Sequence, residues 1–342
     1  MDEARIIPLR SGDPSAPARR RLGRPAPGPG RREASVLPLN PPPAGPPEPP
    51  APAPELQTAA VPRPAGAGVA GLLDAARRRL EGEYEVDAFG FDRDLTEQVV
   101  MPALRPLYRR WFRVEVNGIE NVPRAGGALL VANHAGGLWP LDAVMTALAV
   151  HDEHPDHRFL RMLGANLLFD TPLLGSLARK IGSTVACHED AERLLSAGEL
   201  VGVWPEGFKG IGKPFRERYE LRRFGRGGFV RTALRCEVPI VPVSIIGSEE
   251  THPVLGHAKV LARLLDLPYF PITPTFPWLG PLGLVPLPSK WYLEFGEPIP
   301  VQRYGAAAAD DPATVFDLTD RVRETIQSTL YRLLVQRRSV WR

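Results

Sequence analysis

The sequence predicts an α/β fold, a layered mixed sheet flanked by helices, behind a disordered N-terminal tail. Short apolar runs alternate with helical segments from residue 126 onward, which is typical of a sheet with helices on its faces. The first 66 residues are rich in proline and arginine, and residues 311–338 have the periodicity of a long amphipathic helix. We expect a tail over residues 1–78 and one domain over residues 79–342.

The predicted tail holds 18 of the 39 prolines before residue 65 and no aromatic residue before residue 66. Such a segment cannot bury enough apolar surface to offset its chain entropy, so we expect it to be disordered and partly polyproline-like. The opening MDEARIIPLR lacks the apolar run of seven or more residues that a secretory signal needs. We therefore expect the protein to stay on the cytoplasmic side of the membrane.

A helix with one basic side is predicted over residues 94–112. Asp94 and Glu97 form a capping-box pattern, and apolar residues recur at helical spacing as far as Trp111. The basic side holds Arg105, Arg109 and Arg110. Two interpretations stay open, a helix packed on the core and a helix lying in a lipid interface.

The alternating segments that predict the sheet and its helices run from residue 127 to residue 247. They read GALLVAN, LDAVMTALAV, RFLRML, TPLLGSLARKIG, STVA, AERLLSAG, LVGVW, FGRGGFVRTALRC and PIVPVSIIG. WYLEFGEPI supplies a late strand. The helix expected over residues 311–338 repeats apolar residues every three or four positions, at Val315, Leu318, Val322, Ile326, Leu330 and Leu333.

An uncharged stretch of 23 residues lies between Asp266 and Lys290 and contains seven prolines. Its length suits a membrane-spanning helix, but a spanning helix cannot lose that many backbone donors. We predict an irregular apolar loop and no transmembrane helix. The loop either packs over the core or enters lipid through Phe270, Phe276 and Trp278.

Cysteine content and charge exclude several classes of protein. Cys187 and Cys236 belong to no CxxC or CxxH pair, so disulfide and zinc sites are not expected. The net charge of +3 comes from 42 basic and 39 acidic side chains, which is far from the balance of a nucleic-acid-binding protein.

The block VANHAGGLWPLDA places His134 directly after a buried strand and Asp142 where the next helix begins. A carboxylate there can accept a hydrogen bond from one ring nitrogen, so that the other nitrogen faces a substrate as a base. The alternative is a capped helix start beside a buried histidine.

A second block, LVGVWPEGFKG, runs from an apolar strand into Pro205, Glu206 and Gly207, with Lys209 beyond. Ligands of open α/β sheets gather where strands end. The alternative is an ordinary turn with a solvated glutamate.

These blocks together resemble the glycerolipid acyltransferase family, with its PlsC-type or lysophosphatidate-acyltransferase-like fold, over about residues 110–300. Asn133, His134 and Asp142 resemble its first block, and Gly182, Ser183 and Thr184 stand at the second. Pro205, Glu206 and Gly207 match the third block, and VPIVPVSIIG resembles the fourth.

The resemblance implies transfer of an acyl group from acyl-CoA or acyl carrier protein to the hydroxyl of a lysophospholipid or other glycerolipid. His134 would be the general base, and Pro205, Glu206 and Gly207 would seat the acceptor together with Asn133. No cofactor, metal or serine nucleophile is implied, and the sequence has no GxSxG elbow. The expected partners are a membrane surface and the two substrates, with no nucleic acid.

Two departures from the family pattern concern the same blocks. The family has four residues between its histidine and aspartate, whereas AGGLWPL separates His134 from Asp142. Either the extra glycines form a wider loop that returns Asp142 to His134, or Asp142 only caps a helix. Phe208 and Lys209 replace the Thr or Ser and Arg that commonly continue the third block.

A basic run follows the third block, with seven positive charges against Glu217 and Glu220 between Lys209 and Arg226. We expect Lys209, Lys213 and Arg226 to bind a phosphate of lysolipid, coenzyme A or membrane lipid. The alternative is a solvated basic loop.

A histidine cluster, HDEHPDH, contains His151, His154 and His157, and Pro155 interrupts the helix that would align them on a metal. We therefore expect a solvated surface loop.

Two other functions remain open for the whole chain, a catalytically silent lipid-binding or membrane-scaffolding protein and a hydrolase of acyl thioesters.

Overall fold

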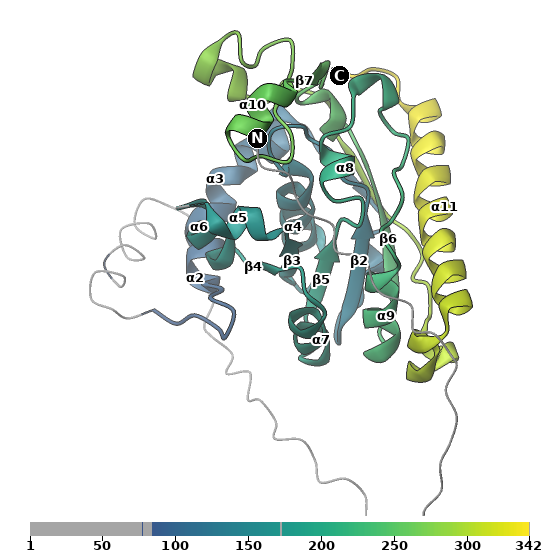
Figure 1. Ribbon diagram of the computed structural model, residues 1–342. Coiled ribbons are helices and arrows are strands. Elements are labelled where there is room, and N and C mark those ends of the chain that lie inside the picture. The colour runs from purple at the N-terminus through teal and green to yellow at the C-terminus, as the bar shows by residue number, and fades with distance from the viewer. Residues whose placement is uncertain (1–76, 78–83, 172, 342) are drawn as a thin grey trace, which may run out of the picture. The chain divides into compact units, whose positions relative to one another are not determined.

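Seven strands form the central sheet in a computed structural model that describes residue 77, residues 84–171 and residues 173–341 (Figure 1). Their order is β1-β9-β6-β2-β5-β3-β4. Five strands are parallel, whereas β9 is antiparallel to β6 and parallel to β1, so the predicted mixed sheet is confirmed. The strands span Glu115–Asn117 (β1), Ala128–Ala132 (β2), Leu160–Gly164 (β3), Ser183–Val185 (β4), Leu200–Val203 (β5), Ile240–Ile246 (β6) and Tyr292–Phe295 (β9). The predicted N-terminal tail lies outside the described residues, apart from Arg77.

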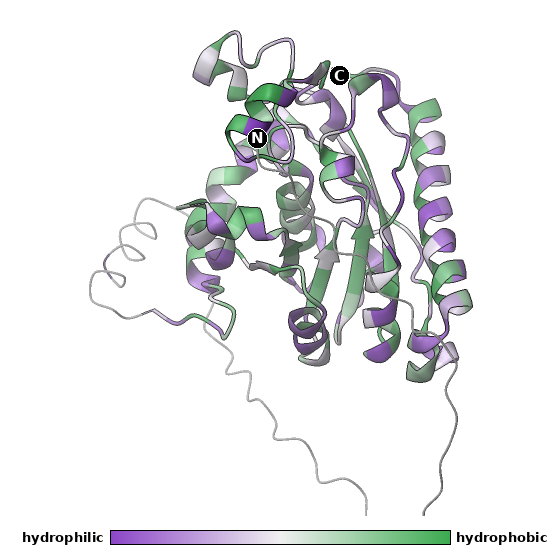
Figure 2. Cartoon of the chain, viewed as in Figure 1, coloured by the Kyte–Doolittle hydropathy of each residue, from purple (hydrophilic) through white to green (hydrophobic). Residues whose placement is uncertain are grey.

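Helices cover both faces of this sheet because the side chains of each strand alternate between the faces. In β2, Leu129 and Val131 join a core with α7, α9 and α11, and Ala128, Leu130 and Ala132 join a second core with α4. Figure 2 shows the central strands as hydrophobic and α11 with alternating hydrophilic and hydrophobic bands. The longer helices are α4 (Leu141–Glu153), α6 (Leu174–Lys180), α7 (His188–Ser196), α9 (Gly228–Arg235) and α11 (Pro312–Gln336).

The helix α11 confirms the prediction made from its periodicity. Its buried residues are the six apolar residues of the repeat, Val315, Leu318, Val322, Ile326, Leu330 and Leu333. Asp311 caps its first turn by accepting hydrogen bonds from the backbone N–H groups of Ala313 and Thr314.

The N-terminal helical region begins at Arg93, two residues earlier than a capping box with Asp94 as the N-cap predicts. It runs through α2 (Arg93–Leu95), a π-helical turn (Thr96–Val100), α3 (Met101–Pro106) and a second π-helical turn (Leu107–Trp111). The N-cap is the buried Asp92, whose Oδ1 accepts from Leu95 N at 2.8 Å, so the assignment of Asp94 as the cap is wrong.

The same region packs on the core, as the first of the two interpretations expects. Met101 and Tyr108 are buried in the core that contains α4. Arg105 on its basic side forms two hydrogen bonds of 2.8 Å with Asp152 of α4, and these hydrogen bonds raise the pKa of Arg105.

The histidine cluster at the end of α4 is not the solvated loop that the sequence predicts. His151 and His154 are buried, at 5% and 1% exposure, and His157 is exposed. His154 Nε2 lies 3.2 Å from Val122 O, and His157 Nδ1 lies 2.8 Å from His151 O. Because the rings satisfy nearby carbonyl groups, the cluster closes the connection from α4 to β3.

The apolar stretch between Asp266 and Lys290 is irregular, as predicted. It contains β8 (Pro271–Ile272), which pairs with β7 (Gly256–His257), and a 3₁₀ turn over Gly280–Leu284. Phe270 and Phe276 are half-buried with ring centroids 5.4 Å apart, while Trp278 is 69% exposed. Within the part of the chain that the structure describes, no helix has the length and apolar character to cross a membrane.

Candidate active site

His134 and Asp142 form a hydrogen-bonded pair at the carboxyl end of β2. His134 Nδ1 lies 2.7 Å from Asp142 Oδ2, and Asp142 is the second residue of α4. The same Oδ2 accepts from Ala135 N at 2.8 Å, and Oδ1 accepts from Ala143 N at 2.9 Å. Because these backbone donors arrange the carboxylate as an acceptor, the ring proton belongs on Nδ1 and Nε2 is the basic nitrogen.

The burial of the pair differs between its two members. The Asp142 side chain has no exposed surface, whereas 14% of the His134 side chain is exposed. A buried carboxylate behind a partly open imidazole orients the ring and leaves a route for a proton donor to reach it. The Trp204 ring, with its centroid 6.1 Å from that of His134, covers another side of the imidazole.

The long connection between His134 and Asp142 folds as a loop that brings the two together. Gly136 and Gly137 have φ values of +128° and +68°, which favour glycine, and a Cβ on Gly136 would lie 2.5 Å from Trp139 O. Gly137 N donates to Ile211 O, and Tyr269 Oη donates to Gly137 O at 2.8 Å. The extra residues therefore form the wider loop that returns Asp142 to His134.

Glu206 connects the second block to His134 through the backbone. Its Oε1 accepts from His134 N at 2.9 Å, and its Oε2 accepts from Arg222 N at 2.6 Å. The side chain is fully buried, so both oxygens are committed to fixing these two segments. Glu206 therefore contacts the backbone of His134 and is closed to solvent, whereas the resemblance implies that it contacts the acceptor.

Lys213, expected to bind phosphate, is inside the protein. Its Nζ lies 3.1 Å from Glu249 Oε1 and 3.8 Å from Glu206 Oε2, and 1% of the side chain is exposed. Burial raises the pKa of Glu249 to about 7, although Lys213 and the Tyr219 N–H oppose that shift. The ammonium group thus balances two buried carboxylates and does not face solvent.

Asn133 is also buried, and it joins two strands. Its Nδ2 donates to Ile245 O at 3.0 Å and its Oδ1 accepts from Ile245 N at 2.8 Å. Both polar ends of the amide are therefore used by β6, which fixes the end of β2 immediately before His134.

The remaining predicted site residues lie at the surface. Gly207 has φ +56° at the start of α8 (Phe208–Ile211), and Lys209 in that helix is exposed. Pro205 and the exposed Arg226 line a cavity of about 240 Å³ together with Cys187 and His188. Lys209 and Arg226 are thus the two basic residues of the prediction that remain open to a ligand.

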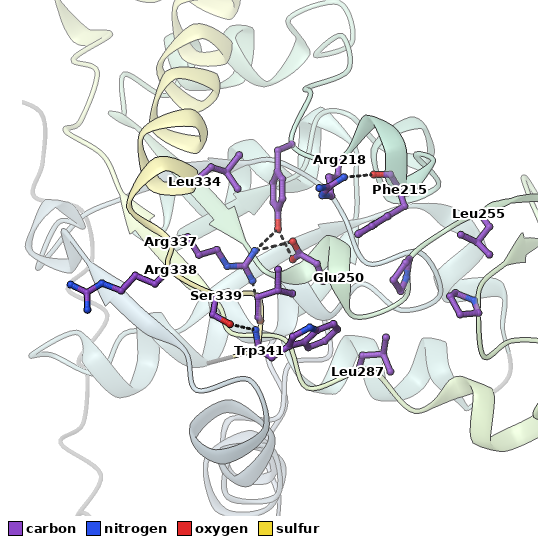
Figure 3. A pocket seen from close by; sticks show the side chains of 14 residues that line it. Phe215, Arg218, Glu250, Leu255, Leu287, Leu334, Arg337, Arg338, Ser339 and Trp341 are labelled. Carbon is purple, nitrogen blue, oxygen red and sulfur yellow. Dashed lines mark hydrogen bonds and ion pairs between the residues drawn. The ribbon is translucent and has the colours of Figure 1, made fainter.

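A larger cavity of about 780 Å³ is lined by none of the residues of the His134 block (131–143) or the Glu206 block (200–210) (Figure 3). Figure 3 shows Arg337 directed at Glu250 on one side of it and Phe215, Leu255 and Trp341 around the other sides. Arg337 Nη1 lies 2.8 Å from Glu250 Oε1, and the Tyr219 hydroxyl donates to the same carboxylate. This network fixes the end of α11 to the segment after β6.

Several residues of the site were missed from the sequence. Glu249 and Glu250 stand three and four residues after the end of the apolar strand β6, so an acidic pair near a strand end was the available signal. Nothing in the sequence around Tyr269 indicates a role in the site, because its hydrogen bond to Gly137 O joins residues 132 positions apart.

The fold and the site define an α/β protein with a histidine and aspartate pair, arranged as in general-base catalysis, at the carboxyl end of a sheet strand. A family model described as acyltransferase matches residues 113–246. An uncharacterized protein of Mycobacterium tuberculosis strain H37Rv is 60% identical over 275 residues, which cover 80% of this chain and 76% of that protein. The chain therefore belongs to one family with that mycobacterial protein, and the matched residues assign its domain to the acyltransferases.

More distant similarities extend beyond the mycobacteria. A human protein described as a DGAT1/2-independent enzyme synthesizing storage lipids is 24% identical over 222 residues, covering 64% of this chain and 61% of that protein. The crystal structure of the 1-acyl-sn-glycerophosphate (LPA) acyltransferase PlsC from Thermotoga maritima matches with a TM-score of 0.48 and 19% identity. That match covers 78% of this chain and 90% of the other chain.

Proposed function

We propose that the protein transfers a fatty acyl group from an acyl thioester to a hydroxyl of a lysophospholipid or other glycerolipid, with His134 as the general base. The observation that carries this proposal is the 2.7 Å contact between His134 Nδ1 and a buried carboxylate held by two backbone donors. That contact leaves Nε2 free to accept the hydroxyl proton. Membership of the acyltransferase family supports the reaction type.

In the proposed reaction, the hydroxyl oxygen bonds to the thioester carbonyl carbon as Nε2 takes the hydroxyl proton. The carbon–sulfur bond then breaks, and the imidazolium returns the proton to the departing thiolate. No acyl-enzyme forms. The donor is acyl-CoA or acyl carrier protein, and the acceptor reaches the protein from the cytoplasmic surface of a membrane.

The roles of the surrounding residues follow from their contacts. Glu206 is a positioning residue, since its contact to His134 N fixes the backbone that carries the imidazole. Asn133 has the same kind of role through β6. Lys209 and Arg226, which are exposed, are proposed to bind a phosphate of the donor or acceptor.

The proposal is tested by supplying purified protein with a labelled acyl thioester and a panel of lysolipids. Wild-type protein is expected to form diacyl product, and His134→Ala is expected to lose at least a hundredfold in turnover. His157→Ala removes an exposed histidine and serves as the matched control. Equal turnover by His134→Ala would remove the catalytic role.

Two outcomes of the same experiment would replace the proposal with another function. Release of free fatty acid at the same rate without any lysolipid would identify a hydrolase. Binding of lipid without product from any donor and acceptor pair would identify a catalytically silent lipid-binding protein.

A further inference from the structure

Apolar side chains that face solvent gather on α10 (Lys259–Leu264) and on the 3₁₀ turn after it. Their exposed fractions include 78% for Val260, 76% for Leu264 and 72% for Leu282. We name this set the apolar rim and define it as Phe208, Val260, Leu261, Leu264, Leu265, Trp278, Leu279, Leu282 and Val285. A surface this apolar on a folded protein marks an interaction site.

The orientation of α10 is the reverse of that of an ordinary surface helix. Val260, Leu261 and Leu264 point to solvent, whereas the small Ala262 is the buried residue. A helix in contact with water normally buries its large apolar side chains. The exposed face of α10 therefore suits an apolar environment outside the protein.

The elements that carry the apolar rim are connected to one another. Ala258 N, just before α10, donates to Phe270 O, and the β7–β8 pair joins residues 256–257 to residues 271–272. The Phe208 ring of α8 packs against the Tyr269 ring, with centroids 6.5 Å apart. Figure 1 shows α8, α10 and β7 at the same end of the sheet.

Charges and backbone chemistry at the apolar rim favour a lipid surface. Along residues 208–211 and 256–289, three exposed cations, Lys209, Lys259 and Arg263, accompany a single carboxylate, Asp266. Basic and aromatic residues around a short apolar helix suit the headgroup region of an anionic bilayer. A six-residue helix is about 9 Å long, and the prolines of the adjacent segment leave backbone groups that need water, so insertion is shallow.

The segments that carry the apolar rim are hydrogen-bonded, through Leu284 and Tyr269, to the loop that joins His134 to Asp142. Trp139 Nε1 donates to Leu284 O at 3.2 Å, and Tyr269 Oη donates to Gly137 O at 2.8 Å. His252 Nε2 lies 3.2 Å from the same Leu284 carbonyl oxygen. A surface engaged at the apolar rim would therefore lie close to the loop of the candidate active site.

We propose that the apolar rim docks the protein shallowly on an anionic lipid bilayer, with the loop that joins His134 to Asp142 on the side that faces the headgroup region. Docking at this position delivers a membrane-embedded acceptor to His134 without removing it from the bilayer. Delivery of the acceptor rests on the proposed function, whereas docking itself depends on the apolar rim and the cations beside it.

The docking is tested by co-sedimentation of the full chain with vesicles of phosphatidylcholine, with and without phosphatidylglycerol. Wild-type protein is expected to bind the anionic vesicles, and Val260→Asp/Leu264→Asp is expected to bind at least roughly tenfold more weakly. Val335→Asp on α11 is the matched control, because Val335 is 88% exposed and lies outside the apolar rim. Circular dichroism melting checks that all three proteins are folded.

Three results would overturn the docking proposal. The first is equal vesicle binding by the double variant and the Val335→Asp control. The second is failure of the folded wild-type protein to bind anionic vesicles. The third is a wild-type dimer in solution that the double variant converts to a monomer, which would identify the apolar rim as a self-association surface.

A kinetic comparison separates failure of docking from failure of the proposed chemistry. The double variant is expected to lose turnover of a vesicle-embedded acceptor and to keep turnover of a short-chain acceptor that is monomeric in water. His134→Ala is expected to bind vesicles as wild type does and to turn over neither acceptor. Parallel losses on both acceptors by the double variant would contradict delivery at the apolar rim.

Discussion

Asp142 receives three donors on its two oxygens, from His134 Nδ1, Ala135 N and Ala143 N. All three contacts require an acceptor, and only a carboxylate offers two acceptor oxygens at this position. The residue therefore does more than cap α4, since it also determines which nitrogen of the imidazole carries the proton. The two interpretations of Asp142, a partner of His134 and a capping residue, describe the same side chain.

Asp142→Asn is predicted to lower kcat by about a hundredfold or more while leaving KM nearly unchanged. The asparagine NH₂ group would face one of these three donors, so the imidazole loses its fixed tautomer or its orientation. The measurement is steady-state thiol release from an acyl thioester over a range of acceptor concentrations. Asp156→Asn, which removes an exposed ion pair with Arg124, is the control.

A rise in KM with unchanged kcat for Asp142→Asn would assign the residue to substrate binding. Full activity would show that another group orients His134.

At the residue scale, the sequence identified His134 and Asp142 because both stand next to a predicted strand or helix boundary. It assigned Glu206 and Lys213 by position along the chain, as if each faced a ligand. Their partners are His134 N and Glu249, which lie 72 and 36 residues away. Contacts of that kind depend on how strands are ordered in the sheet, and residue spacing alone does not reveal them.

At the scale of secondary-structure elements, the side-chain amide of Asn133 extends the hydrogen bonding between strands β2 and β6. Residues Leu129 to Ala132 pair with Ile240 to Val243, and Asn133 then bonds to both backbone groups of Ile245. The two strand ends that flank the site are thereby held together beyond the regular pairing.

Asn133→Ala is predicted to lower the free energy of unfolding by about 2–4 kcal/mol, because it leaves the buried N–H and C=O of Ile245 without their partner. Urea unfolding followed by tryptophan fluorescence measures the change. Asn166→Ala, at an exposed position of α5 (Asn166–Asp170), is expected to change stability by less than about 1 kcal/mol. Similar small losses for both variants would contradict the bridging role.

The elements that the sequence predicted are those with a long or strongly apolar pattern, including β2, β6 and α11. It did not predict β1 and β7, which have three and two residues. Glu115–Asn117 has no apolar run. It is a strand because it pairs with β9, in which each partner residue lies 177 positions later in the sequence. Helix α10 was also missed, since its leucines continue into a proline-rich segment and its apolar face points outward.

At the scale of the whole described domain, the residues after 246 complete the fold that the acyltransferase family model covers from 113 to 246. They supply β9 between β1 and β6, and α11 covers one face of the sheet. Buried charges connect these parts, with Arg337 paired to Glu250 and Lys213 paired to Glu249. Stability should therefore depend on the protonation of Glu249, whose pKa is raised by burial.

Glu249→Gln is predicted to flatten the pH dependence of stability between about pH 4.5 and 7. Burial raises the pKa of Glu249 from 4.5 to about 7, so the folded protein holds this proton more firmly than the unfolded chain does. Unfolding releases the proton in this range, and the free energy of unfolding falls as pH rises, by up to about 3 kcal/mol. Glutamine does not ionise and removes this contribution.

The measurement is urea unfolding of wild type and Glu249→Gln at several pH values from 4.5 to 8, with Glu120→Gln as an exposed control. Contributions from other titrating groups cancel in the difference between two proteins. The wild-type stability should fall relative to Glu249→Gln as pH rises to 7 and then stay level, because Glu249 is ionised in both states above that pH. Parallel curves for the two proteins would mean that Lys213 and the Tyr219 N–H hold Glu249 ionised throughout, with a pKa no higher than that of the unfolded chain.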